Sequence, residues 1–158
     1  MKQRINLFLF VLISGILFAQ DDLLSQAKSL FNDGQYSASQ SILNQLSNTD
    51  NSTAEIMYLN AKCSKKLFLS DAVSLYNDLN EIFPYHEFKD EVNKDLALIY
   101  YREKKYNYAI ALFSEIKELS NEHLFKLAYA HFSINSLEEA QFYFSKIMDT
   151  DSKFSSTS

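Results

Sequence analysis

The chain has 158 residues, of which 15 are Lys or Arg and 20 are Asp or Glu, so its formal net charge at pH 7 is −5. An acidic chain repels phosphate backbones, which excludes nucleic acid as an expected partner. Two glycines, one proline and a 47% share of hydrophobic residues favour long helices over a turn-rich β fold, and the single cysteine excludes an intramolecular disulfide.

The first 19 residues resemble a secretory signal peptide. Lys2 and Arg4 precede an apolar stretch over residues 7–18, and the small residue Ala19 follows it. The apolar stretch is shorter than the ~20 residues that a membrane-spanning helix needs. We therefore predict that the chain is exported and cleaved after Ala19, with an uncleaved N-terminal anchor as the alternative. No cysteine lies near the cut, so a lipid anchor is not expected.

Apolar residues recur through the rest of the chain with the spacing i, i+3, i+4, i+7, which is typical of the buried face of an amphipathic helix. Val92, Leu96 and Ile99 mark one such face. Gly34 and Pro84 supply breaks, because glycine can take the left-handed conformation that ends a helix and proline cannot continue one. The predicted helices cover residues 21–32, 36–47, 53–66, 70–82, 88–103, 106–119, 121–133 and 137–149.

In four of these helices a small residue is followed four positions later by a large apolar one. The pairs are Ser39 and Leu43, Ala72 and Tyr76, Ala109 and Phe113, and Ala140 and Phe144. The small residues are 33, 37 and 31 positions apart, a period that is typical of a helical solenoid. We interpret the small residues as the points where the two helices of one repeat cross closely.

The repeat resembles the tetratricopeptide repeat family, whose pattern combines a bulky residue, a Leu-Gly-like pair, an aromatic residue and a later alanine. The matching residues are Asn93, Leu96, Ala97 and Tyr100 in the third repeat, Leu124, Leu127, Ala128 and His131 in the fourth, Ile56, Leu59, Asn60 and Cys63 in the second, and Leu23, Ala27 and Leu30 in the degenerate first. The resemblance implies an all-α fold, a right-handed α-solenoid of about four helix-turn-helix repeats over residues 20–151, preceded by a signal-peptide helix over residues 1–19.

The C-terminal end of the array has no polar capping element of the kind that helical arrays need. The last helix carries Phe142, Phe144 and Met148, and only a short tail over residues 152–158 follows. We interpret this tail as the start of a continuation. The expectation is that further repeats or self-association cover this end.

No catalytic or metal-binding pattern is present in the sequence. His86, His123 and His131 do not form the His-Glu-x-x-His spacing of a zinc site, and the glycine content excludes a phosphate-binding loop. We expect His86 to be an exposed loop residue, His131 a packed and hydrogen-bonded one, and Cys63 a small buried hydrophobe. The chain is therefore predicted not to be an enzyme and to need no cofactor or metal.

The resemblance implies that side chains of the first helix in each repeat line a concave, peptide-binding face. The candidate groove residues are Lys28, Phe31, Lys65, Lys94, Leu98, Tyr101, Arg102, Phe125, Tyr129 and Phe132. Such a surface suits a protein or peptide with apolar anchors and some acidic residues. The alternative is that these side chains only pack against the adjoining helices.

By resemblance, the predicted function is a non-catalytic scaffold for protein–protein interactions in the periplasm or at the outer-membrane periphery. Exported members of the family often serve outer-membrane or cell-envelope complexes in bacteria, so association with outer-membrane proteins is expected. The alternative is an N-terminal recognition arm of a larger exported enzyme or transporter-associated protein.

Overall fold

The computed structural model describes residues 21–48 and 52–155, and within the last helix it describes side chains as far as residue 148. In these residues the only regular secondary structure is α-helix, which confirms the predicted all-α fold. The predicted signal peptide over residues 1–19 lies outside the described residues. None of the described helices is long and apolar enough to cross a lipid bilayer.

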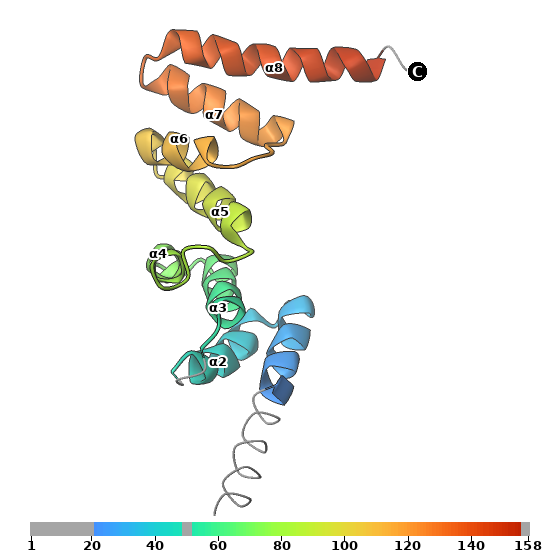
Figure 1. Ribbon diagram of the computed structural model, residues 1–158, viewed down its shortest axis with the longest axis vertical. Coiled ribbons are helices and arrows are strands. Elements are labelled where there is room, and N and C mark those ends of the chain that lie inside the picture. The colour runs from blue at the N-terminus through green and yellow to red at the C-terminus, as the bar shows by residue number, and fades with distance from the viewer. Residues whose placement is uncertain (1–20, 49–51, 156–158) are drawn as a thin grey trace, which may run out of the picture. The chain divides into compact units, whose positions relative to one another are not determined.

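Eight helices follow one another in the described residues (Figure 1). A first helix over residues 21–32 is followed by α2 (Tyr36–Ser47), α3 (Ala54–Lys66), α4 (Ala72–Ile82), α5 (Lys89–Arg102), α6 (Tyr106–Ser114), α7 (Asn121–Ser133) and α8 (Leu137–Ser155). The bounds lie within two residues of the predicted ones, except that α6 ends earlier and α8 ends later. Pro84 follows α4 closely, as its inability to continue a helix predicts.

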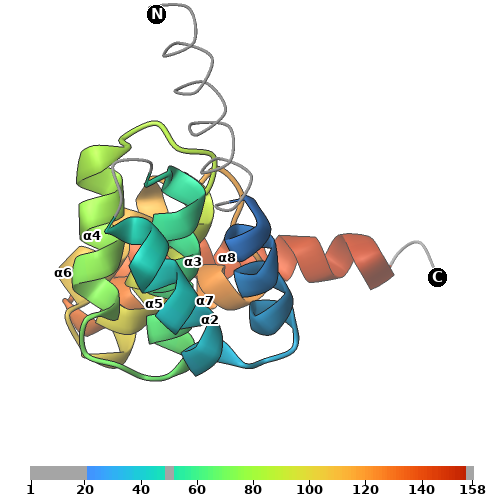
Figure 2. The same ribbon diagram turned by 90° about the horizontal axis from the view of Figure 1, so that it is seen from below.

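The chain divides into two compact units, Met1–His86 and Glu87–Ser158. In the first unit α2 packs against α3, and α3 packs against α4 (Figure 2). In the second unit α5 packs against α6, α6 against α7, and α7 against α8. Within each unit a helix therefore contacts the next one along the chain, which is how helix-turn-helix repeats stack.

The turns between the two helices of each repeat share one backbone conformation. Their left-handed residues are Gly34 (φ 75°), Phe68 (φ 56°), Lys104 (φ 60°) and Asn135 (φ 64°). In each turn the next residue donates its backbone N–H to the carbonyl five positions earlier, which is the closing bond of a Schellman motif. The bonds run from Gln35 to Leu30, Leu69 to Ser64, Lys105 to Tyr100 and Ser136 to His131, over 2.8–3.0 Å. The side-chain repeat is thus also a repeat of backbone conformation.

The small residues that define the repeat are buried, as the close crossing of two helices requires. At most 4% of the surface is exposed at Ser39, Ala72, Ala109 and Ala140. The large residues four positions later are completely buried in the first three repeats, whereas Phe144 in the fourth is half-buried. The burial that the predicted crossing points require is therefore observed.

A second set of small residues lies on the first helix of each repeat, seven positions before the left-handed turn. These residues are Ala27, Ala61, Ala97 and Ala128, and each is completely buried. The register predicted for the second repeat, which placed Asn60 in the position of Ala97, is therefore wrong by one residue. The apolar spacing of this helix is compatible with either register. The turn that sets the register has Phe68 at its left-handed position, where a glycine would have marked the turn in the sequence.

Helix α6 ends at Ser114, five residues before the predicted end. Ile116 continues the apolar spacing of Ala109, Leu112 and Phe113, and it is buried. The chain brings it inward through turn hydrogen bonds, from the N–H of Glu115 to the carbonyl of Leu112 (3.2 Å) and from the N–H of Ile116 to the carbonyl of Phe113 (3.3 Å). A non-helical turn can bury Ile116 as well as a continued helix could. The spacing of apolar residues does not distinguish these two conformations.

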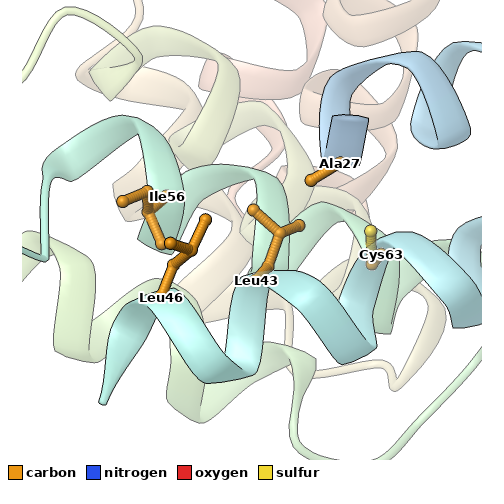
Figure 3. Close-up of a cluster of buried hydrophobic side chains, with 5 residues drawn as sticks. All are labelled: Ala27, Leu43, Leu46, Ile56 and Cys63. Carbon is orange, nitrogen blue, oxygen red and sulfur yellow. The ribbon is translucent and has the colours of Figure 1, made fainter. Parts of the chain in front are cut away.

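The core of the first unit joins side chains from three helices (Figure 3). Ala27 comes from the first helix, Leu43 and Leu46 come from α2, and Ile56 and Cys63 come from α3. Burial of a large aliphatic side chain contributes about 1.5–3 kcal/mol relative to exposure. This cluster therefore holds the three helices together.

Cys63 is a buried residue whose thiol belongs to a short chain of hydrogen bonds. The thiol donates to the Ser39 hydroxyl over 3.6 Å, and that hydroxyl donates to the Ala27 carbonyl over 2.8 Å. Burial raises the pKa of the Cys63 thiol, and the hydrogen bond with Ser39 offsets only part of this rise. The prediction of a small buried hydrophobe at this position is confirmed.

Candidate protein-binding site

Aromatic side chains from three helices of the second unit meet in one group. We call Tyr101 on α5, Tyr106 on α6, and Tyr129 and Phe132 on α7 the aromatic cluster. The ring centroids lie 5.8 Å apart for Tyr101–Tyr106, 6.1 Å for Tyr101–Tyr129, and 6.4 Å for both Tyr106–Tyr129 and Tyr129–Phe132. The three tyrosines meet edge to face, an arrangement that the charge distribution of aromatic rings favours.

The inner side of the aromatic cluster rests on the core of the second unit. Leu98 and Tyr101 of α5 pack against a buried group that includes Ala97, Phe113 and Leu127. Protein interiors are close-packed, so these buried side chains cannot shift without opening voids. The Tyr101 ring is therefore held in place by residues that do not themselves reach the surface.

The outer side of the aromatic cluster is open. Tyr129 is 41% exposed and Phe132 is 57% exposed, while Tyr101 and Tyr106 are half-buried. Burial, together with the neighbouring hydroxyls of Tyr106 and Tyr129, raises the pKa of Tyr101. Its hydroxyl is a hydrogen-bond donor at neutral pH. Exposed aromatic rings on a fixed base, with hydroxyl groups between them, are typical of a protein contact surface.

Basic side chains on the same helices are partly engaged in ion pairs. Lys105 pairs with Glu103 over 2.7 Å, and Lys126 pairs with Glu122 one turn earlier on α7. Two of the candidate groove residues in this unit are basic, and both lie on α5. These are Lys94, which is half-buried, and Arg102, which is exposed.

The three candidate groove residues of the first unit are engaged within that unit. Lys28 forms a 2.6 Å ion pair with Glu55. Phe31 packs against the core and meets the Tyr36 ring edge to face, with centroids 5.2 Å apart. Lys65 lies half-buried in the last turn of α3. Packing inside the unit accounts for Phe31, whereas the α7 candidates Phe125, Tyr129 and Phe132 are exposed.

One face of α7 carries Phe125, Tyr129 and Phe132, at the spacing i, i+4, i+7 of a helix stripe. Phe125 is exposed, and its ring contacts Phe144 on α8 at a centroid distance of 5.7 Å. The structure thus brings Tyr101, Tyr129 and Phe132 into one cluster and places Phe125 farther along the same helix face.

Tyr106 is a cluster residue that the sequence analysis did not select. It opens α6, three positions before Ala109, where the ring reaches both Tyr101 and Tyr129. A signal was present in the spacing, because Phe31 and Tyr36 form the same five-residue pair in the first repeat and their rings also touch. Comparing aromatic pairs between repeats could therefore have found it.

His86 corrects a prediction, because it is buried and not exposed. Its backbone N–H donates to the Phe83 carbonyl over 3.2 Å, and this turn directs the ring back toward α4. There its Nε2 lies 3.0 Å from the Asn80 side-chain oxygen. The loop after Pro84 thus folds back onto its own helix, and the polar sequence around His86 does not reveal this.

His131 is packed as predicted, and its ring stacks on Tyr143 with centroids 5.4 Å apart and 19° between the planes. Within the part of the chain that the structure describes, the buried Nδ1 atom has no hydrogen-bond partner, so the predicted hydrogen bond is absent there. The same described residues contain no group of three His, Cys, Asp or Glu side chains that could hold a metal ion.

Comparison with known proteins identifies the fold through solved structures. No protein-family model and no curated protein matches the chain. A crystal structure of MamA protein matches 87% of this chain and 75% of its own length, with a TM-score of 0.70 and 17% sequence identity. MamA AMB-1 matches 84% of this chain and 71% of its own length, with a TM-score of 0.66 and 20% identity.

A third similar structure, MamA MSR-1, covers 84% of this chain and 75% of its own length, with a TM-score of 0.63 and 20% identity. At these identities the likeness concerns the fold. It agrees with the helix hairpins and the repeated turns described above. The chain therefore has an all-helical repeat fold of the tetratricopeptide type.

Proposed function

We propose that the chain is a non-catalytic tetratricopeptide scaffold that binds protein partners through the aromatic cluster. The observation that carries this proposal is the gathering of four aromatic rings from three helices on a buried base, with Tyr129 and Phe132 open to solvent. Aromatic side chains held in place lose little freedom on binding and dominate the energetics of protein interfaces.

The partner that fits this surface is an extended or helical segment with apolar anchors and some acidic residues. Its apolar side chains would cover the Tyr129 and Phe132 rings, and tyrosine hydroxyls of the cluster would bond to polar groups at the edge. Lys94 and Arg102 on α5 supply positive charge for acidic side chains.

We further propose that this scaffold acts outside the cytoplasm, in the periplasm or at the outer-membrane periphery, where it holds envelope proteins together. Support comes from the charged start, apolar stretch and small Ala19 of the first 19 residues. Mass spectrometry of the protein from fractionated cells tests this. The expected product is an envelope-fraction chain that begins at Gln20, and a cytoplasmic chain that retains Met1 would contradict it.

Crosslinking followed by affinity capture from the envelope fraction tests the binding role. The test variant is Tyr129→Ala combined with Phe132→Ala, which removes the exposed half of the aromatic cluster. The matched control is Tyr108→Ala, because Tyr108 is an exposed tyrosine of α6 that contacts Tyr100 and not the cluster.

We expect the double variant to lose partners that both the wild-type protein and the Tyr108→Ala control retain. The far-ultraviolet circular dichroism of all three proteins should be the same, because the substituted side chains are exposed. Identical sets of partners for the double variant and the wild type would show that the aromatic cluster is not the binding surface.

A further inference from the structure

Phe68 stands at a position that is unfavourable for both its backbone and its side chain. Its φ of 56° lies in the left-handed region, which a residue with a Cβ atom disfavours, and 84% of its surface is exposed. The other repeats place Gly34, Lys104 and Asn135 in this turn. Lys104 carries the same backbone strain, so the feature specific to Phe68 is its exposed ring, which indicates a contact made at the turn.

The same unit has an apolar hollow at the opposite end of the α3–α4 hairpin. This hollow has a volume of about 310 Å³, and it is lined by Ala54, Ile82, Phe83, Pro84, Tyr85 and His86. Its rim is unusually apolar for a surface, since Ile82 is 61% exposed and Tyr85 is 98% exposed. A concave apolar site of this kind suits an aromatic side chain.

Phe68 cannot fill the hollow of its own chain. It lies just before α4, whereas the hollow lies just after that helix. The 11 residues of α4 separate the two by roughly 16 Å at about 1.5 Å per residue. A phenylalanine side chain does not span this distance, so only another molecule can bring ring and hollow together.

The two ends of the α3–α4 hairpin also carry opposite charges. Lys65 and Lys66 form the last turn of α3, beside Phe68, and they outnumber the single carboxylate of that turn, Asp71. Glu81 precedes Ile82 at the end of α4, beside the hollow, whereas Glu55 of α3 is already paired with Lys28. Two copies arranged head to tail would bring the basic end of one hairpin to the acidic end of the next.

We propose that Phe68 of one copy inserts into the hollow beside Ile82 and Tyr85 of a second copy of this chain. Ring, hollow and complementary charges all lie on the same unit, so each copy presents both halves of the contact. Because the halves are different surfaces, the contact is heterologous and adds copies head to tail. This self-association does not depend on the proposed partner binding by the aromatic cluster.

The association should be weak and visible at high protein concentration. One aromatic side chain and its rim bury less than the roughly 1,200–2,000 Å² of a stable interface. We therefore expect a dissociation constant on the order of 0.1–1 mM. Sedimentation velocity over a concentration series of the purified protein measures it directly.

Two variants remove one half of the contact each. Phe68→Gly removes the ring and suits the left-handed turn, so its unfolding temperature should equal or exceed that of the wild type while association weakens at least about tenfold. Ile82→Lys fills the hollow with a charge that repels Lys65 and Lys66. It should also abolish self-association, and Phe68→Tyr, which keeps an aromatic ring, should retain it.

Mixing the two defective variants gives the decisive measurement. Phe68→Gly keeps its hollow and Ile82→Lys keeps its ring, so the mixture should form 1:1 dimers and nothing larger. A wild-type protein that stays monomeric at about 1 mM would overturn the proposal. It would equally be overturned by a Phe68→Gly protein that associates like the wild type, or by a mixture that stays monomeric.

Discussion

The left-handed turn position shows how one backbone conformation is imposed on four different side chains. Glycine adopts this conformation freely, whereas a residue with a Cβ atom disfavours it by roughly 1–2 kcal/mol. Gly34 therefore adopts the left-handed conformation without backbone strain, whereas the backbones of Phe68 and Lys104 are strained. The Schellman hydrogen bonds and the packing of the two flanking helices outweigh that strain.

Lys104→Gly should raise the free energy of unfolding by about 0.5–1 kcal/mol, because relief of backbone strain exceeds the added entropy of the unfolded chain. Lys104 is exposed, so no core contact is lost. Urea denaturation followed by circular dichroism measures the change. Lys104→Ala is the control, since alanine keeps the Cβ atom. An equal gain for alanine and glycine would contradict the explanation.

At the scale of elements, α7 carries two histidines whose pKa values are lowered by burial. His131 stacks on Tyr143 of α8, and its desolvation lowers its pKa more than Glu139 raises it. His123 lies at the start of α7 with its ring 5.9 Å from that of Phe113. Burial is also the main reason why the pKa of His123 is lowered.

Acidification should therefore destabilise the second unit. Both histidines have folded-state pKa values below 6.5, so the unfolded chain takes up protons first as the pH falls through 6.5, and the free energy of unfolding decreases. Thermal unfolding between about pH 7.5 and pH 5.5 measures this decrease. His131→Phe should reduce the slope, because it removes one titrating group and keeps the ring. An unchanged slope would contradict the role of His131.

At the scale of the whole molecule, packing follows the order of the chain inside each unit. The two units have separate cores, one around Leu43 and one around Phe113. The stability of a repeat protein is approximately a sum over repeats and the interfaces between neighbours. A destabilising substitution in one core should therefore mainly destabilise the unit that contains it.

Leu43→Ala should destabilise the first unit by about 2–5 kcal/mol, because it leaves a cavity at a completely buried site. Amide hydrogen exchange should accelerate most in the first helix, α2 and α3, and least in α7 and α8. Leu127→Ala is the matched variant in the second unit and should give the reverse pattern. A uniform acceleration along the chain after either substitution would rule out this local response.

The helices, their order and the repeat follow from local features of the chain. Apolar residues spaced three and four apart must share one helix face, whatever lies around them. The small residues at Ser39, Ala72, Ala109 and Ala140 likewise identified the crossing points, because only small side chains let two helices approach closely. The choice of Tyr101, Tyr129 and Phe132 rested instead on the resemblance to the tetratricopeptide repeat family, which implies that first-helix side chains share one face.

Contacts between distant residues settled the rest. The spacing of apolar residues does not reveal the left-handed turn at Phe68 or the early end of α6 at Ser114. It also does not reveal that the loop with His86 folds back onto α4. Tyr106 joins the aromatic cluster because α6 folds back between α5 and α7. Packing depends on which side chains meet in the folded protein. Contacts between residues that are distant in the sequence therefore determine such details, whereas the repeat itself follows from local spacing.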